Sequence, residues 1–320
     1  MYGMKKKAIF IYGPTASGKT AFAEKLASLI PAEIINMDSA QMYTPLSIGT
    51  AKSDWKSTPY AQHLFDIIDE PKHLTVHAYR DMAEQKIDEI CAQDKLPIFV
   101  GGSGFYLKSL FFKLESHTVF PQSCEDESDE SDLWQKLHFI DPERAAQIHP
   151  NDYYRLRRAL EIWQVTGQKP SHYRPEFNPI AEWTIVHVTR DRKKLYKDID
   201  ERVIKMMHAG WLAEVQELLS QGWEAFLLEK GIIGYAELID YIKHTYTLEQ
   251  TVSLIQQRTR NYAKRQETFW RMLKKDIESA RNQTGQNLGK ILEFDLTYSD
   301  IDLYIKQLLG EISILTRGEI

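Results

Sequence analysis

The chain has 320 residues and 43% hydrophobic content, which fits a globular protein with one large α/β domain or a core that carries a smaller second unit. No apolar run approaches a membrane span, and residues 1–7 lack a signal-peptide core, so we expect a cytoplasmic protein with no membrane partner. Cys91 and Cys124 show no metal-ligand spacing, which argues against a zinc site or a disulfide framework. The net charge of −5 hides an asymmetry, because acid concentrates in residues 124–132 and base in residues 256–275.

The strongest motif follows the first apolar segment. Residues 13–20 match the phosphate-binding pattern G-x-x-x-x-G-K-[ST], between a predicted buried strand (8–12) and a predicted amphipathic helix (20–30) with Phe22, Leu26 and Leu29 on its apolar face. In this order, backbone N–H groups and a helix N-terminus surround an anion. We therefore predict that linked phosphates bind to Gly13, Pro14, Thr15, Ala16, Ser17, Gly18, Lys19 and Thr20. In this pattern Lys19 supplies positive charge to the phosphates, and Thr20 offers its hydroxyl to Mg²⁺. The pattern does not distinguish a nucleoside triphosphate from another diphosphate.

Two further apolar segments end at polar residues. Residues 33–37 predict a strand that ends at Asp38, and an Asp at the carboxyl end of a parallel strand faces the ligand crevice. The alternatives for Asp38 are a helix N-cap or a Mg²⁺ ligand. Residues 96–100 predict a third strand, followed by Gly-Gly-Ser-Gly, where Ser103 either approaches a ligand or lies in a tight turn.

Beyond Phe112 the apolar pattern weakens, and residues 115–132 have the composition of an exposed connection. A helix is predicted over residues 153–165, with its start signal at residues 149–152 and a stop at Gly167. Leu156, Leu160 and Trp163 share its apolar face. The arginines at its start indicate either an anionic partner or pairing with Glu161 across one turn.

After another predicted strand (183–188), the chain is mainly helical, and residues 251–275 form its clearest helix. Val252, Ile255, Tyr262, Ala263, Phe269, Trp270 and Leu273 make one apolar stripe on this helix. Arg260, Lys264, Arg271 and Lys275 lie on the opposite side. This basic side is either a solvated surface or a contact with a phosphate backbone.

Several short motifs occur together in a specific order. They are Gly-Pro-Thr-Ala-Ser-Gly-Lys-Thr (13–20), Asp-Ser-Ala-Gln-Met-Tyr (38–43), Gly-Thr-Ala-Lys (49–52), Gly-Gly-Ser-Gly-Phe-Tyr (101–106), Arg-Leu-Arg-Arg-Ala-Leu-Glu (155–161), Gly-Tyr (234–235) and Tyr-Ala-Lys-Arg-Gln (262–266). Over most of its length, the chain resembles the tRNA dimethylallyltransferase family.

The resemblance implies an α/β fold with a P-loop NTPase-like parallel sheet core, a helical insertion and a mainly helical C-terminal part. Residues 1–112 would form the first part of the core, residues 113–175 a shortened helical insertion with an acidic linker at 121–132, and residues 176–320 the rest of the core and the C-terminal helices. The implied reaction transfers a dimethylallyl group from dimethylallyl diphosphate to the N6 amine of the adenosine 3′-adjacent to the anticodon (position 37) of tRNA. Diphosphate is released, Mg²⁺ is the implied cofactor, and we expect a monomer that binds the tRNA anticodon stem-loop.

The resemblance also assigns roles to residues. Asp38 would be the general base, Ser103 would replace the family's Thr in Gly-Gly-Thr-Gly, and Arg202 would lie near the diphosphate. Contacts with tRNA would come from Asp38, Ser39, Ala40, Gln41, Tyr154, Arg155, Leu156, Arg157, Arg158, Arg260, Lys264, Arg265 and Arg271. Tyr43, Phe105 and Tyr106 are candidates to receive the target base, although each also fits a core position.

Three other functions stay open at the level of sequence. One is an adenine-nucleotide isopentenyltransferase, which the basic helix disfavours. Another is a P-loop small-molecule kinase, which would turn over ATP with a small acceptor. The third is a non-catalytic RNA-binding protein, which the presence of Lys19, Thr20 and Asp38 disfavours.

Overall fold

A parallel β-sheet forms the centre of the fold. The computed structural model describes residues 6–114, 132–284, 289–298 and 300–317. Within these ranges, six strands pair in parallel in the order β3-β2-β4-β1-β7-β8. Their bounds are β1 (Lys7–Tyr12), β2 (Ala32–Asn36), β3 (Gln62–His63), β4 (Leu96–Gly101), β7 (Glu182–Thr189) and β8 (Gly289–Asp295). The inner strands are nearly continuous apolar runs because helices cover both of their faces.

Alternate residues of β1 face two different helical layers. Ile9 and Ile11 belong to a cluster with Phe22 of α1 (Lys19–Ala27) and Leu308 of α12 (Ile301–Arg317). Phe10 faces the other way, where its ring packs against Phe99 and Phe111. That second layer contains α2 (Val76–Cys91) and α3 (Gly104–Phe111). The P-loop α/β class expected from the sequence is therefore confirmed.

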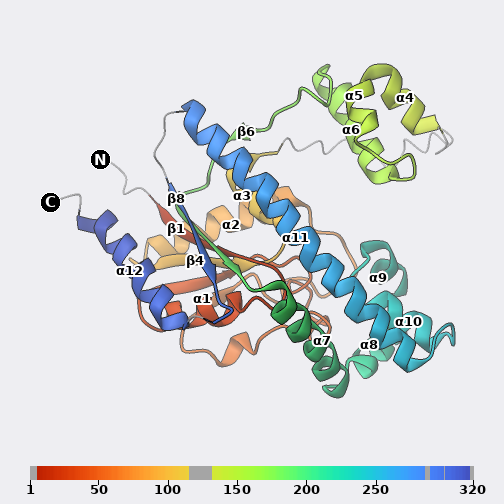
Figure 1. Ribbon diagram of the computed structural model, residues 1–320, viewed down its shortest axis with the longest axis horizontal. Coiled ribbons are helices and arrows are strands. Elements are labelled where there is room, and N and C mark those ends of the chain that lie inside the picture. The colour runs from red at the N-terminus through yellow and green to blue at the C-terminus, as the bar shows by residue number, and fades with distance from the viewer. Residues whose placement is uncertain (1–5, 115–131, 285–288, 299, 318–320) are drawn as a thin grey trace. The chain divides into compact units, whose positions relative to one another are not determined.

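A helical group follows β7 and supplies the wall opposite the phosphate-binding loop. Its members are α7 (Arg192–His208), α8 (Trp211–Ser220), α9 (Glu224–Lys230), α10 (Tyr235–Ile242) and α11 (Leu248–Thr284). The predicted helix over residues 251–275 is the middle of α11, and Ile255, Ala263, Trp270 and Leu273 of its apolar stripe are buried. Figure 1 shows α11 running across this helical group. Helix α11 contacts α7 and α10 near its start and α3 farther along.

Residues 112–178 form a second compact unit. It contains α4 (Leu133–Ile140), α5 (Pro142–Ala146), α6 (Tyr153–Thr166) and a two-stranded antiparallel ribbon of β5 (Phe112–Lys113) and β6 (Glu176–Phe177). As predicted, α6 begins after Asp152, whose side chain accepts the backbone N–H of Arg155, and it ends at Gly167 in the left-handed region. The predicted acidic linker at 121–132 lies outside the described residues apart from its last position.

Two local features differ from the sequence-based expectation. Helix α1 ends at Ala27 rather than at residue 30, and Leu29 is 54% exposed instead of lying on the apolar face. Pro31 explains the early end, because a proline disfavours helical backbone at the residue before it. Strands β3 and β8 were not predicted, since β3 has two residues and β8 mixes polar and apolar side chains at a sheet edge. In the described part of the chain, no helix is long and apolar enough to cross a bilayer.

Candidate active site

The loop between β1 and α1 follows a path that requires glycine. A Cβ on Gly13 would lie 2.2 Å from the Val188 carbonyl oxygen, and Gly18 has a φ of +95°. The backbone of Ala16 is also left-handed, with a φ of 63°. This path is the turn that aims backbone N–H groups and the start of α1 toward an anion, as the motif predicts.

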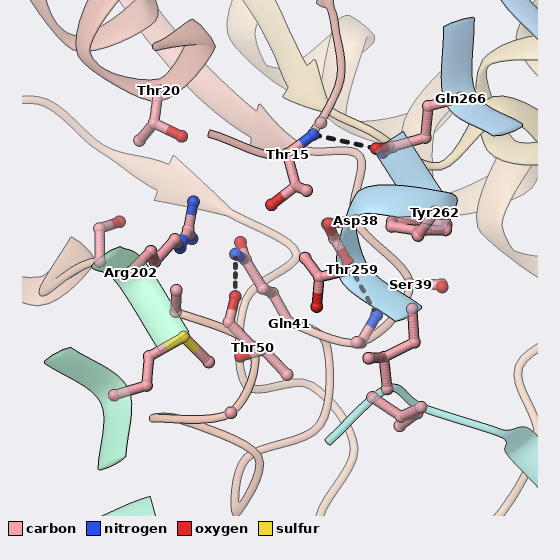
Figure 2. A pocket seen from close by; sticks show the side chains of 18 of the residues that line it. Thr15, Thr20, Asp38, Ser39, Gln41, Thr50, Arg202, Thr259, Tyr262 and Gln266 are labelled. Carbon is pink, nitrogen blue, oxygen red and sulfur yellow. Dashed lines mark hydrogen bonds between the residues drawn. The ribbon is translucent and has the colours of Figure 1, made fainter. Parts of the chain in front are cut away.

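A pocket of about 460 Å³ lies at the carboxyl ends of the central strands, beside this loop. Thr15, Lys19 and Thr20 line it from the loop, and Asp38 to Gln41 line it from the segment after β2. Figure 2 shows Arg202 of α7 on one side of the pocket and Asp38 with Tyr262 of α11 on the other. The structure thus brings the predicted diphosphate loop, general base and arginine around a single cavity.

Positive charge gathers at the loop end of the pocket. Burial, with the nearby charge of Arg202, lowers the pKa of Lys19 to about 8, while Asp38 acts in the opposite direction. The Lys19 Nζ also donates to the Pro14 carbonyl at 3.3 Å. Lys19 and Arg202 repel each other here, so an anionic ligand would relieve their mutual repulsion.

The side-chain amide of Asn36 holds the backbone of Asp38 at the end of β2. The buried Asn36 accepts the Asp38 N–H at 2.9 Å and donates to the Asp38 carbonyl at 3.1 Å and the Leu64 carbonyl at 3.0 Å. One carboxylate oxygen of Asp38 accepts the Ala40 N–H at 3.0 Å. This bond closes a local turn and is not the helix N-cap weighed at the level of sequence, because the described chain starts no helix at Asp38. It leaves the second carboxylate oxygen for a ligand.

Ser103 supports the Asp38 segment. Its hydroxyl accepts the backbone N–H of Ser39 at 3.0 Å, linking the turn after β4 to the turn after β2. Gly101, two residues earlier, can carry no side chain, because a Cβ there would lie 2.1 Å from the Met37 carbonyl oxygen. The hydroxyl predicted at this position therefore holds the neighbouring turn in place.

Gln266 is a site residue whose role was not foreseen. Its Oε1 accepts the Thr15 N–H of the phosphate-binding loop at 2.9 Å (Figure 2). Its Nε2 donates to the Gly102 carbonyl at 2.8 Å. Its own carbonyl accepts the Tyr12 hydroxyl at 3.2 Å. The signal in the sequence was a buried amide on the apolar side of a helix, because such a side chain needs polar partners.

The pocket also has an apolar wall. Ile199, Val203 and Met206 of α7 line it near Arg202, together with Ile232 and Ile233 from the segment before α10. Burial raises the pKa of Tyr262, so its hydroxyl keeps its proton and stays a hydrogen-bond donor. The cavity thus combines a cationic end, a single carboxylate and an apolar surface.

The basic side chains of α11 that are predicted to bind tRNA lie in three different surroundings. Lys264 and Arg271 are exposed, and Arg265 lines the pocket with its guanidinium over the Tyr262 ring. Arg260 instead pairs with Asp200 of α7 and is half-buried. Its charge is already balanced, so Arg260 is a weaker candidate for a phosphate contact than Lys264 or Arg271.

Residues 154–158 belong to α6 in the second unit. Tyr154 is 77% exposed and Arg157 is exposed, so both are accessible. Arg155 pairs with Asp152 at 3.3 Å, and Arg158 pairs with Glu161 at 2.5 Å, the alternative considered above. The expectation of a side-chain contact for Leu156 is wrong, because Leu156 is fully buried in the core of this unit.

Two of the three aromatic candidates for receiving the target base are core residues. Tyr43 is 1% exposed and donates to the Lys72 carbonyl at 2.7 Å, and Tyr106 is 4% exposed and stacks on Tyr79. Phe105 is 59% exposed and packs beside Phe269. Of the three, only Phe105 keeps a ring available at the surface.

The strand, the glycine loop and the helix in a parallel sheet define a P-loop α/β protein. The sequence model of the IPP transferase family matches residues 41–273, and that of the isopentenyl transferases matches residues 6–59. The chain belongs to the IPP transferase family.

Individual relatives agree with this assignment. A tRNA dimethylallyltransferase of Alkaliphilus oremlandii is 37% identical over 281 residues, which cover 84% of this chain and 89% of the relative. The crystal structure of the full-length tRNA isopentenylpyrophosphate transferase of Bacillus halodurans is 31% identical and superposes with a TM-score of 0.69, covering 97% of this chain and 96% of that one. The structure of a eukaryotic dimethylallyltransferase acting on tRNA is 28% identical and superposes with a TM-score of 0.76. The match covers 92% of this chain and 74% of the eukaryotic chain.

Proposed function

We propose that this protein transfers a dimethylallyl group from dimethylallyl diphosphate to the N6 amine of the adenosine 3′-adjacent to the anticodon (position 37) of tRNA, releasing diphosphate. Family membership and the relatives' activity on tRNA support this proposal. The observation that carries it is the single pocket in which the cations Lys19 and Arg202 lie near the carboxylate of Asp38. A group transfer between an anionic donor and an amine needs both kinds of side chain.

The donor's diphosphate binds at the loop, where backbone N–H groups, Lys19 and Arg202 neutralise the charge that develops as the carbon–oxygen bond breaks. The Thr20 hydroxyl lines the same end of the pocket and is a hard oxygen ligand of the kind that Mg²⁺ accepts alongside phosphate oxygens. A Mg²⁺ ion held by Thr20 and the diphosphate would supply further positive charge to the leaving group. The apolar wall formed by Val203 and Met206 accommodates the prenyl chain.

The acceptor adenine reaches the pocket by leaving the stack of the anticodon loop, which costs little in a single-stranded loop. Its exocyclic nitrogen is a weak nucleophile and keeps its protons until it bonds to carbon. The new carbon–nitrogen bond forms as the electron pair of the carbon–oxygen bond departs with diphosphate. Asp38 then takes the proton from the nitrogen, so that transfer accompanies or follows bond formation.

The working unit in this proposal is a monomer. The anticodon stem-loop contacts exposed cations of α11 and α6, and we place the reaction in the cytoplasm, where tRNA is modified. Incubating tRNA with the enzyme and the donor, followed by mass spectrometry of nucleosides, tests the function. Appearance of N6-dimethylallyladenosine supports it, whereas ATP-dependent phosphorylation of a small acceptor without prenylated nucleoside would contradict it.

Replacing Gln266 by Leu removes the side-chain bonds to the Thr15 N–H and the Gly102 carbonyl. We expect KM for dimethylallyl diphosphate to rise about fivefold, because the loss of one bond that shapes the loop is worth roughly 1 kcal/mol. Steady-state kinetics with saturating tRNA measure this change. Gln257→Leu, at an exposed position on the same helix, is the matched control and should match the wild type. An unchanged donor KM in Gln266→Leu would contradict a loop-shaping role.

Reversing both exposed cations, Lys264→Glu with Arg271→Glu, should weaken tRNA binding while sparing donor binding. Each lost phosphate contact makes the slope of log K against log salt shallower by about 0.7, the value for single-stranded nucleic acid. Filter binding at several salt concentrations gives that slope. Lys306→Glu on α12 is an exposed control of the same chemistry. Equal affinity and slope in the double variant would identify the basic side of α11 as a solvated surface.

A further inference from the structure

The carboxylate of Glu214 on α8 holds a pocket loop that is distant in the sequence. Its Oε2 accepts the backbone N–H groups of Ser47 at 3.0 Å and Ile48 at 2.6 Å. Its Oε1 accepts the N–H of Gly49 at 3.1 Å and the hydroxyl of Tyr235 at 2.8 Å. Three consecutive backbone donors and a tyrosine therefore converge on one half-buried carboxylate.

The loop is also held by shape. A Cβ on Gly49 would lie 2.1 Å from the indole nitrogen of Trp211 and 2.5 Å from the ring of Tyr235. The far side of the loop has its own anchor, because the Lys52 Nζ donates to the Tyr43 carbonyl at 2.7 Å and pairs with Asp66 at 2.5 Å. Glu214 is thus the part of this arrangement that ties the loop to the helical group.

The loop in turn orients Gln41, a residue that the family resemblance assigns to tRNA contact. The Gln41 Nε2 donates to the Thr50 carbonyl at 3.0 Å, one residue beyond the three N–H groups that Glu214 holds. Figure 2 shows this bond, and both Gln41 and Thr50 line the pocket. With one amide hydrogen engaged, the direction of the amide is fixed, and its carbonyl oxygen and second hydrogen remain for a ligand. Those two groups are the pair with which a glutamine side chain recognises adenine.

We propose that Glu214 is a positioning residue for recognition of the acceptor base. It acts through the loop at residues 47–50, which sets the direction of the Gln41 amide. This inference rests on the proposed function, since it takes the acceptor to be an adenine in RNA. Glu214 itself does not line the pocket.

Glu214→Gln tests the inference, because an amide of the same size has one acceptor oxygen, so two of the four hydrogen bonds are lost. We expect KM for the tRNA stem-loop to rise about three- to tenfold, with KM for dimethylallyl diphosphate unchanged. The preference for adenosine over purine riboside at the target position, measured by stem-loop binding, should fall by a similar factor. A merely structural role would leave that base preference unchanged.

Glu217→Gln is the matched control, as Glu217 is exposed on the same helix and bonds locally to Gln221. Tyr235→Phe is a second variant in case Glu214→Gln folds poorly. It removes one of the four hydrogen bonds and keeps the ring beside Gly49, so a smaller loss in the same two measurements is expected. A wild-type enzyme that prenylates no RNA overturns the proposed function. If the wild type is active but both variants keep its KM for tRNA and its base preference, the proposed role of Glu214 is overturned.

Discussion

Asp38→Asn is expected to lower the rate of dimethylallyl transfer in a single turnover by about 10²- to 10⁴-fold, the usual range for loss of a general base. The amide keeps the size of the side chain and can still accept the Ala40 N–H, so the turn after β2 should persist. It cannot take a proton from the adenine nitrogen. Donor and tRNA affinities should therefore stay near the wild type, and rapid-quench kinetics with enzyme in excess isolate the chemical step.

Asp69→Asn provides the control for Asp38→Asn, because Asp69 is an exposed aspartate in the same unit. It should transfer at the wild-type rate. If Asp38→Asn retained most of the single-turnover rate, the carboxylate would be a turn-capping group and some other acceptor would remove the proton. If instead the affinity for donor collapsed with the rate, Asp38 would belong with the groups that hold the diphosphate.

Local sequence patterns predicted the parts of the site that are contiguous in the chain. The loop at residues 13–20 needs its glycines at fixed spacing, and the structure places a carbonyl where a Gly13 side chain would lie. Asp38 was predicted from its position after an apolar run, because carboxyl ends of parallel strands share one edge of the sheet. These features depend on neighbours within a few residues, which a pattern can record.

Contacts between distant segments could not be predicted in the same way. Gln266 meets Thr15 across 251 positions, and Glu214 meets Gly49 across 165. Each is one polar residue on a helix until the fold brings its partner near. Leu156 received two conflicting indications from the sequence. Its place within an arginine-rich motif indicated a contact with nucleic acid, whereas its periodic spacing indicated a core position, and in the structure it is buried in the core. For that side chain, burial of apolar surface decides the orientation.

Lys19→Ala is expected to raise KM for dimethylallyl diphosphate and lower kcat/KM by about 10- to 100-fold, since a charge-assisted contact is worth roughly 1.5–3 kcal/mol. The charge also makes a prediction about pH. With its pKa lowered to about 8, Lys19 in the free enzyme is a cation below that pH and loses its charge above it. The value of kcat/KM for the donor should therefore be flat below about pH 8 and fall above it.

Lys19→Arg separates this effect from other titrations, because a guanidinium stays charged throughout the range. Its kcat/KM should remain flat above about pH 8, where the wild type declines, and Lys19→Ala should be low and flat across the same range. Bound diphosphate favours the charged lysine, so kcat at saturating donor should decline at a higher pH than kcat/KM does. An identical alkaline decline in all three proteins would assign the titration to another group and remove Lys19 from the set of residues that hold the leaving diphosphate.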